Sequence, residues 1–156
     1  MHAAPAVPPS AESVPRQWFR RVWNELDAGA IDELLAPDGV AHGLGAEPIR
    51  GPRGFHEFHR AFVSSFGGIH VEVLHEVIEG DLAVVRCVVS AMPAGRAERA
   101  RFEGFALFRL SGGRIVEGWN TWDFAGLMEQ LAILPPGALA LALTGQLQPH
   151  QQAAGA

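Results

Sequence analysis

Cysteine and tyrosine are nearly missing from this sequence, which has one cysteine, Cys87, and no tyrosine among its 156 residues. A single cysteine excludes an intrachain disulfide and a cysteine-rich zinc site, and such sparse use fits a reducing cytoplasm. Without tyrosine, no phenol can serve as the hydrogen-bond donor to an oxyanion. Cys87 itself lies in an apolar run, where we expect an inert core residue.

Long apolar runs and basic stripes are missing as well. No apolar stretch reaches the roughly 18 residues that span a bilayer, so we expect no membrane segment. The twelve Lys and Arg residues are scattered, and the net charge is −5. The cluster of Arg96, Arg99 and Arg101 is interrupted by Glu98 and Glu103, which indicates a solvated loop. Nucleic acid is therefore not an expected partner.

The length and composition predict one globular domain with two loosely held ends. Hydrophobic residues make up 48% of the chain, enough for a core that needs no disulfide or metal. Residues 1–12 are rich in Ala and Pro and are predicted to be disordered. They have neither the basic start nor the apolar core of a signal peptide. The domain is expected over 13–136, followed by a partly helical tail over 137–156.

Helical periodicity dominates the first part of the domain. Ser13 and Pro15 begin a helix that continues to about residue 29, and a short helix is expected over 31–35. A turn and a short strand follow over 37–45. A third helix opens near Gly51 and carries a phenylalanine stripe at spacings of three and four residues, of which Phe62 is also expected to line a pocket.

The period then changes from 3.6 to 2, which predicts strands. Alternating or β-branched segments cover 69–78, 82–92, 101–110 and 114–123, joined by short glycine-containing turns or by a loop. A helix or turn is expected after residue 123. Helices followed by a meander of strands indicate an α+β fold with a mostly antiparallel sheet.

Several segments, in this order, resemble one known family. They are PDGVAHG (37–43), GPRGFHEFHRAF (51–62), EGDLAVVR (79–86), GGRIVEGWNTWD (112–123) and GLMEQLAILPP (126–136). Together they resemble the SnoaL-like polyketide cyclases of the (nuclear transport factor two)-like superfamily. One departure is that the chain reads SAMPAGRAERA (90–100) where many ester-cyclase-type members have a Gly-Thr-His-x-Gly stretch.

The resemblance implies a fold and an activity. The fold would be a cone-shaped, strongly curved sheet with the N-terminal helices packed on its concave face, enclosing one apolar pocket. Members usually form homodimers through the outer face of the sheet. The best-known members close a polyketide ring by acid–base chemistry without a metal or organic cofactor, so neither is expected here. His56 and His59 lie three residues apart, but no carboxylate nearby completes a metal site.

The last strand carries the main candidates for a site. In a strand without a bulge, Ile115 shares one face with Glu117, Trp119, Thr121 and Asp123. A carboxylate beside an indole in a closed pocket would have a raised pKa and could exchange protons near neutral pH. Asp123 is therefore the predicted catalytic acid–base, with N-capping of the next helix as the alternative. Glu117 and Trp119 are predicted to bind the ligand, although Glu117 could instead pair with an arginine.

Two further residues complete the predicted site. His42 matches a histidine that the family often carries in its first strand and is predicted to assist in proton transfer. Arg86 interrupts an apolar strand, so its charge must be paired or solvated. It either lines the pocket, meeting Glu117, Asp123 or a ligand carboxylate, or lies on the outer face.

Two functions follow. The first is a cofactor-free cyclase, isomerase or dehydratase acting on a small hydrophobic carbonyl compound, with epoxide hydrolysis through Glu117 and Arg86 as a variant. The second is a non-catalytic protein that binds a small apolar ligand or serves as a dimerisation domain. Asp123 on the predicted face of Trp119 favours the first, whereas the missing histidine stretch favours the second.

Overall fold

The computed structural model describes residues 11–146, and most of the predicted N-terminal segment and the last ten residues of the tail lie outside this range. It contains five α-helices, one π-helix and six strands within the described residues. In chain order they are α1 (Val14–Gln17), η1 (Trp18–Asn24, the π-helix), α2 (Gly29–Leu34), β1 (Leu35–His42), β2 (Ile49–Arg50), α3 (Gly51–Ser65), β3 (Phe66–Glu79), β4 (Leu82–Pro93), β5 (Ala100–Ser111), β6 (Arg114–Trp122), α4 (Phe124–Gln130) and α5 (Ala138–Leu143).

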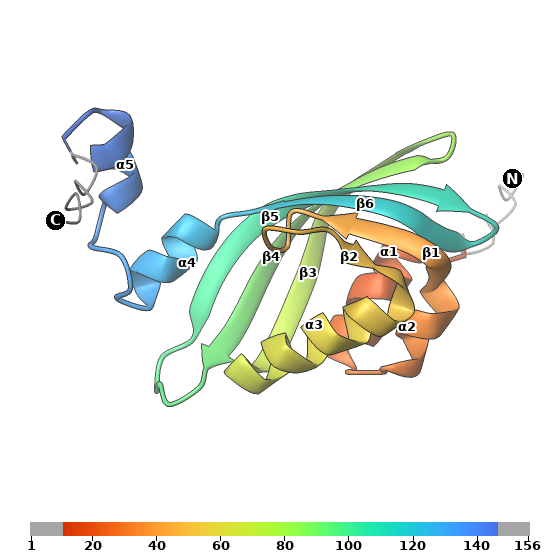
Figure 1. Cartoon of the computed structure of the whole chain (residues 1–156), viewed down its shortest axis with the longest axis horizontal. Coiled ribbons are helices and arrows are strands. Elements are labelled where there is room, and N and C mark those ends of the chain that lie inside the picture. The colour runs from red at the N-terminus through yellow and green to blue at the C-terminus, as the bar shows by residue number, and fades with distance from the viewer. Residues whose placement is uncertain (1–10, 147–156) are drawn as a thin grey trace, which may run out of the picture.

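The six strands form one curved sheet in the order β2-β1-β6-β5-β4-β3. All neighbouring strands are antiparallel except β1 and β6, which are parallel. Helices α1 to α3 and η1 lie on the concave side of the sheet, and α4 and α5 lead away from the end of β6 (Figure 1). The predicted α+β fold with a strongly curved, mostly antiparallel sheet is confirmed.

Local sequence signals explain most element boundaries. The Ser13 hydroxyl accepts a hydrogen bond from the Arg16 amide at 3.3 Å and so caps α1. Gly80 has a φ of +59° in the turn between β3 and β4, a conformation that glycine adopts without strain. The sequence did not predict the two-residue strand β2 or the division of the first helix into α1 and η1.

The core fills the space between the helices and the concave sheet face. It combines aromatic side chains of η1 and α3 with aliphatic residues of β4 and β5. Two polar contacts fasten η1 to the rest of the domain. Asn24 pairs with the backbone of Val71 in β3, donating to its carbonyl at 2.9 Å and accepting from its amide at 2.7 Å. Cys87 is buried in this core, as expected from its apolar strand.

His59 makes the second contact. It is a buried polar residue on α3, and its Nε2 donates to the carbonyl of Val22 at 2.9 Å. Its ring lies 4.9 Å from that of Trp23, centroid to centroid. Burial lowers the pKa of His59, the hydrogen bond to Val22 opposes this shift, and the nearby His56 lowers the pKa further. The native state therefore holds a neutral imidazole that joins α3 to η1.

This lowered pKa predicts a loss of stability in acid. The unfolded chain takes up a proton at the ordinary histidine pKa while the folded chain does not, so stability is complete above that pKa and falls as the pH drops below it. We expect His59→Gln, which keeps an N–H donor, to lose less unfolding free energy than wild type between about pH 7 and pH 5. Chemical denaturation measures this, with the exposed His70→Gln as control. If wild type, His59→Gln and His70→Gln lose the same unfolding free energy over this pH range, His59 is not the source of the acid sensitivity.

Candidate functional site

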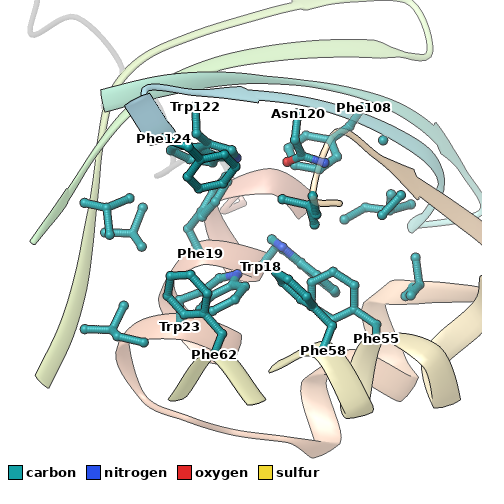
Figure 2. Close-up of a pocket in the computed structure, with 18 of the residues that line it drawn as sticks. Trp18, Phe19, Trp23, Phe55, Phe58, Phe62, Phe108, Asn120, Trp122 and Phe124 are labelled. Atoms are coloured by element: carbon teal, nitrogen blue, oxygen red, sulfur yellow. The ribbon is translucent and has the colours of Figure 1, made fainter. Parts of the chain in front are cut away.

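An apolar cavity lies between the helices and the concave face of the sheet. Its volume is about 60 Å³, several times the roughly 10–15 Å³ that one water needs. Figure 2 shows aromatic side chains facing one another across it. The lining residues are Trp18, Phe19, Trp23, Leu35, Val40, Ala41, Leu44, Phe55, Phe58, Phe62, Ile69, Val71, Val89, Phe102, Phe108, Ile115, Gly118, Asn120, Trp122 and Phe124.

One wall of the cavity is formed by packed aromatic rings from η1 and α3, called here the aromatic mesh. The ring of Trp23 lies 6.2 Å from Phe55, 6.4 Å from Phe58 and 5.5 Å from Phe62, each in an edge-to-face arrangement. The phenylalanines recur at helical spacing, so α3 presents them on one face. Phe62 thus lies where the sequence predicted it, in the lining of the cavity.

The opposite wall comes from β6, where a bulge changes which side chains face inward. Arg109 of β5 pairs with Glu117, but Leu110, the next residue, pairs with Ile115. Val116 is therefore an extra residue in β6, and alternation reverses across it. Ile115 lines the cavity before the bulge, and Gly118, Asn120 and Trp122 line it afterwards.

The expectation that Glu117, Trp119 and Asp123 share the face of Ile115 was therefore wrong. It assumed an unbroken alternation, which the bulge interrupts. Glu117 and Trp119 lie on the outer face of the sheet, and neither they nor Asp123 line the cavity. Asn120, which the sequence analysis did not single out, takes the inward position. Only knowledge of the bulge could have identified it.

The structure brings three of the predicted site residues together, outside the cavity. His42 Nε2 lies 2.9 Å from Glu117 Oε1, and both side chains are one-third exposed. The His42 ring stacks on Trp119 with ring centroids 5.7 Å apart. The guanidinium of Arg109 lies 5.8 Å from the centre of the Trp119 ring. Glu117 therefore pairs with a histidine from β1, not with an arginine.

Arg86 and Asp123 lie apart from this group. Arg86 is on the outer face, where its guanidinium donates to Glu103 at 2.5 Å, so it does not converge with Glu117. The side chain of Asp123 is exposed and accepts a hydrogen bond from the Gly126 amide at 2.8 Å, capping α4. The alternative structural role considered for Asp123 is thus present.

Titratable groups are scarce around the cavity. None of the described residues that line it has an ionisable side chain, and Asn120 is the only amide among them. Burial raises the pKa of Cys87 to about 12, so its thiol is protonated and unreactive at neutral pH. Within residues 11–146, no group of three or more His, Cys, Asp and Glu side chains is arranged to hold a metal ion.

Comparison with known proteins identifies the family of this chain. The family model for SnoaL-like polyketide cyclases matches residues 13–131. The chain belongs to the SnoaL-like polyketide cyclase family. A comparison with curated proteins found no match. None of the helices in the described part of the chain is long and apolar enough to cross a membrane.

Solved structures agree with this family assignment. A "putative polyketide cyclase" from Bacillus cereus is 18% identical, with a TM-score of 0.70 over 78% of this chain and 79% of that one. IdmH from Streptomyces antibioticus, described in the same words, is 26% identical, with a TM-score of 0.67 over 76% and 96% of the two chains. TsrD from Streptomyces laurentii is 25% identical, with a TM-score of 0.67 over 78% and 93%.

The cap formed by Asp123 predicts distinct effects for two substitutions. Asp123→Ala removes the acceptor for the Gly126 amide and should cost about 1 kcal/mol of unfolding free energy. Asp123→Asn keeps a good capping side chain and should stay within about 0.5 kcal/mol of wild type. Urea denaturation measures both. If Asp123→Ala is as stable as wild type, the cap contributes nothing to the fold.

Proposed function

We propose that this SnoaL-like protein binds one small, uncharged, mostly apolar molecule in the cavity of the sheet. The observation that supports it most directly is the lining, in which aromatic and aliphatic side chains surround a single amide. Small-molecule sites are typically concave and apolar, with a few polar groups that orient the ligand. The volume of about 60 Å³ is smaller than the roughly 150 Å³ cavity that holds benzene, so a one-ring compound binds only when the lining side chains move apart.

The free energy for binding would come mainly from burial of apolar surface. Transfer of apolar area from water gains roughly 25 cal/mol per Å², and edge-to-face aromatic contacts add to it. Trp23 and the phenylalanines of α3 already make such contacts with one another. A flat ligand ring would make contacts of the same kind with these side chains.

Acid–base turnover is the second candidate function, favoured by the family and by the description of IdmH. Here Asp123 would be the acid–base and His42 would assist, on a small hydrophobic carbonyl compound. Because neither side chain lines the cavity, the reacting atom would have to lie outside it. If Asp123→Asn and His42→Ala both retain full turnover on a substrate found by screening, this assignment fails.

A cavity-filling substitution tests the binding function. Ala41 lines the cavity and is buried, so Ala41→Phe would occupy the space of a ligand ring. We expect 4-ethylanisole to bind wild type and to change its tryptophan fluorescence, because three of the four tryptophans line the cavity. Ala41→Phe should weaken this binding at least about tenfold, or roughly 1.4 kcal/mol.

The matched control is Thr121→Phe, which adds a ring at an exposed position of β6 outside the cavity lining. It should bind 4-ethylanisole like wild type, and circular dichroism should confirm that both variants fold. The proposal fails if wild type binds neither 4-ethylanisole nor any other neutral one-ring compound, or if Ala41→Phe binds 4-ethylanisole as tightly as wild type does.

We also propose a homodimer through the outer face of the sheet. Directly paired residues of four strands form an outer row, Val77–Val84–Leu107–Trp119. Val77 is 67% exposed and Val84 is 39% exposed. Phe105, which is 52% exposed, adds a ring to this face. A contiguous apolar patch of this kind typically marks a protein–protein contact.

A charge placed on this apolar face should separate the protomers. Phe105→Glu would remove an apolar ring and place a carboxylate at the contact, where it must lose its hydration, so we expect it to convert a dimer into a monomer in sedimentation velocity experiments. Ile133→Glu is the control, because Ile133 is 65% exposed and lies outside the sheet. A wild-type protein that sediments as a monomer would contradict the proposal, and so would a Phe105→Glu variant that remains dimeric.

A further inference from the structure

The amide of Asn120 is held in one orientation at the end of β6. Its Nδ2 donates to the carbonyl of His42 in β1 at 3.0 Å. The two strands also approach closely at Gly43, whose φ is +81°, and a Cβ placed there would lie 2.0 Å from the backbone oxygen of Asn120. Because the carbonyl of His42 can only accept, the amide nitrogen must point toward it, and the opposite end must be Oδ1.

Asn120 Oδ1 is consequently a free acceptor at the cavity. No hydrogen bond within residues 11–146 reaches it, yet no buried side-chain nitrogen or oxygen in that range is sealed off without a partner. Figure 2 shows Asn120 at the roof of the hollow, with its nitrogen and oxygen on opposite sides of the amide. The group that satisfies this oxygen must be a donor, such as a hydroxyl.

Trp18 supplies a free donor from the other side. Its indole nitrogen is turned toward the middle of the cavity in Figure 2. Trp23 and Trp122 also line the cavity. None of these three indole N–H groups donates to a residue within 11–146, so the Trp18→Phe variant below decides whether Trp18 is the donor. The indole N–H can only donate, so it requires an acceptor such as a carbonyl oxygen. The ring itself is held edge-to-face against Phe55, with centroids 4.8 Å apart.

Charge on the ligand is disfavoured by the same lining. None of the described lining residues is basic, so a carboxylate in the cavity would lose its hydration without gaining a counter-ion. A neutral molecule loses much less hydration free energy. Each of its polar groups can form a hydrogen bond with Asn120 or Trp18.

We infer that the ligand is a neutral hydroxy-carbonyl compound, whose hydroxyl donates to Asn120 Oδ1 and whose carbonyl oxygen accepts from the indole N–H of Trp18. This inference rests on the proposed binding function and specifies the polarity of the ligand. It also assigns to Asn120 the discrimination between a hydroxyl and its methyl ether.

Four one-ring probes separate these contributions in the wild-type protein. They are 4-hydroxyacetophenone, with both groups, 4-methoxyacetophenone, without the donor, 4-ethylphenol, without the carbonyl, and 4-ethylanisole, with neither. Isothermal titration calorimetry at about pH 6 keeps the phenols neutral. We expect 4-hydroxyacetophenone to bind about fivefold more tightly than either single-group probe, the difference that one neutral hydrogen bond typically makes. The anion 4-hydroxybenzoate should bind at least about tenfold more weakly.

Two variants assign each preference to its residue. In Asn120→Leu, 4-hydroxyacetophenone and 4-methoxyacetophenone should bind within about twofold of each other, because the acceptor is gone. In Trp18→Phe, the preference for 4-hydroxyacetophenone over 4-ethylphenol should vanish while the hydroxyl preference remains. The comparisons in wild type do not depend on whether either variant folds.

The outcomes distinguish this inference from the proposed function. If 4-ethylanisole binds as tightly as 4-hydroxyacetophenone, the hydroxy-carbonyl inference is overturned while a neutral cavity ligand stands. If 4-hydroxybenzoate binds best, both the inference and the uncharged ligand of the proposed function are overturned. Wild-type preferences that persist unchanged in Asn120→Leu and Trp18→Phe would also overturn it. If none of the probes binds, the proposed function itself fails.

Discussion

At Val116, strand β6 holds one residue more than the neighbouring strand β5, and the identity of the cavity lining depends on this local constraint. A regular strand would have turned Glu117 inward and Asn120 outward. The bulge reverses this arrangement from Glu117 onward. It replaces a potentially acidic wall by an amide, a glycine and an indole, and so gives the cavity its neutral, apolar character.

The side chains of β6 that the bulge turns away from the cavity lie on the outer face of the sheet. Glu117 meets His42 there, and Trp119 stacks on the same imidazole, so the charged and amphipathic side chains of β6 find partners outside. The inward side chains can then be almost entirely apolar without leaving a buried charge unpaired. A single extra residue thus keeps the charged side chain of Glu117 out of the apolar interior.

The aromatic wall opposite β6 is held by polar contacts behind it. His59 bonds the backbone of η1, and Asn24 bonds the backbone of β3 with both ends of its amide. Both contacts lie outside the cavity lining, so they fix the rings without adding a polar surface to the hollow. Together they keep the aromatic mesh of α3 and η1 facing Asn120.

Periodicity predicted most of the secondary structure because it reports which face of an element is buried. The stripe on α3 and the alternation along β3 to β5 are strong examples, and Phe62 of that stripe lies in the cavity lining. The bulge could not be predicted, because side-chain alternation alone does not show where the register between β5 and β6 shifts. The inward position of Asn120 was missed for this reason. The parallel pairing of β1 with β6 was missed because the two strands are distant in sequence.

The indole N–H groups offer the most direct test of which face receives the ligand. The chain has four tryptophans, of which Trp18, Trp23 and Trp122 line the cavity and Trp119 lies outside its lining. In ¹⁵N–¹H correlation spectra, titration with 4-hydroxyacetophenone should shift the indole signals of the three cavity residues, with the largest change at Trp18. The signal of Trp119 should stay in place. A shift confined to Trp119 would contradict the account and would place the ligand at the outer face with His42 and Glu117.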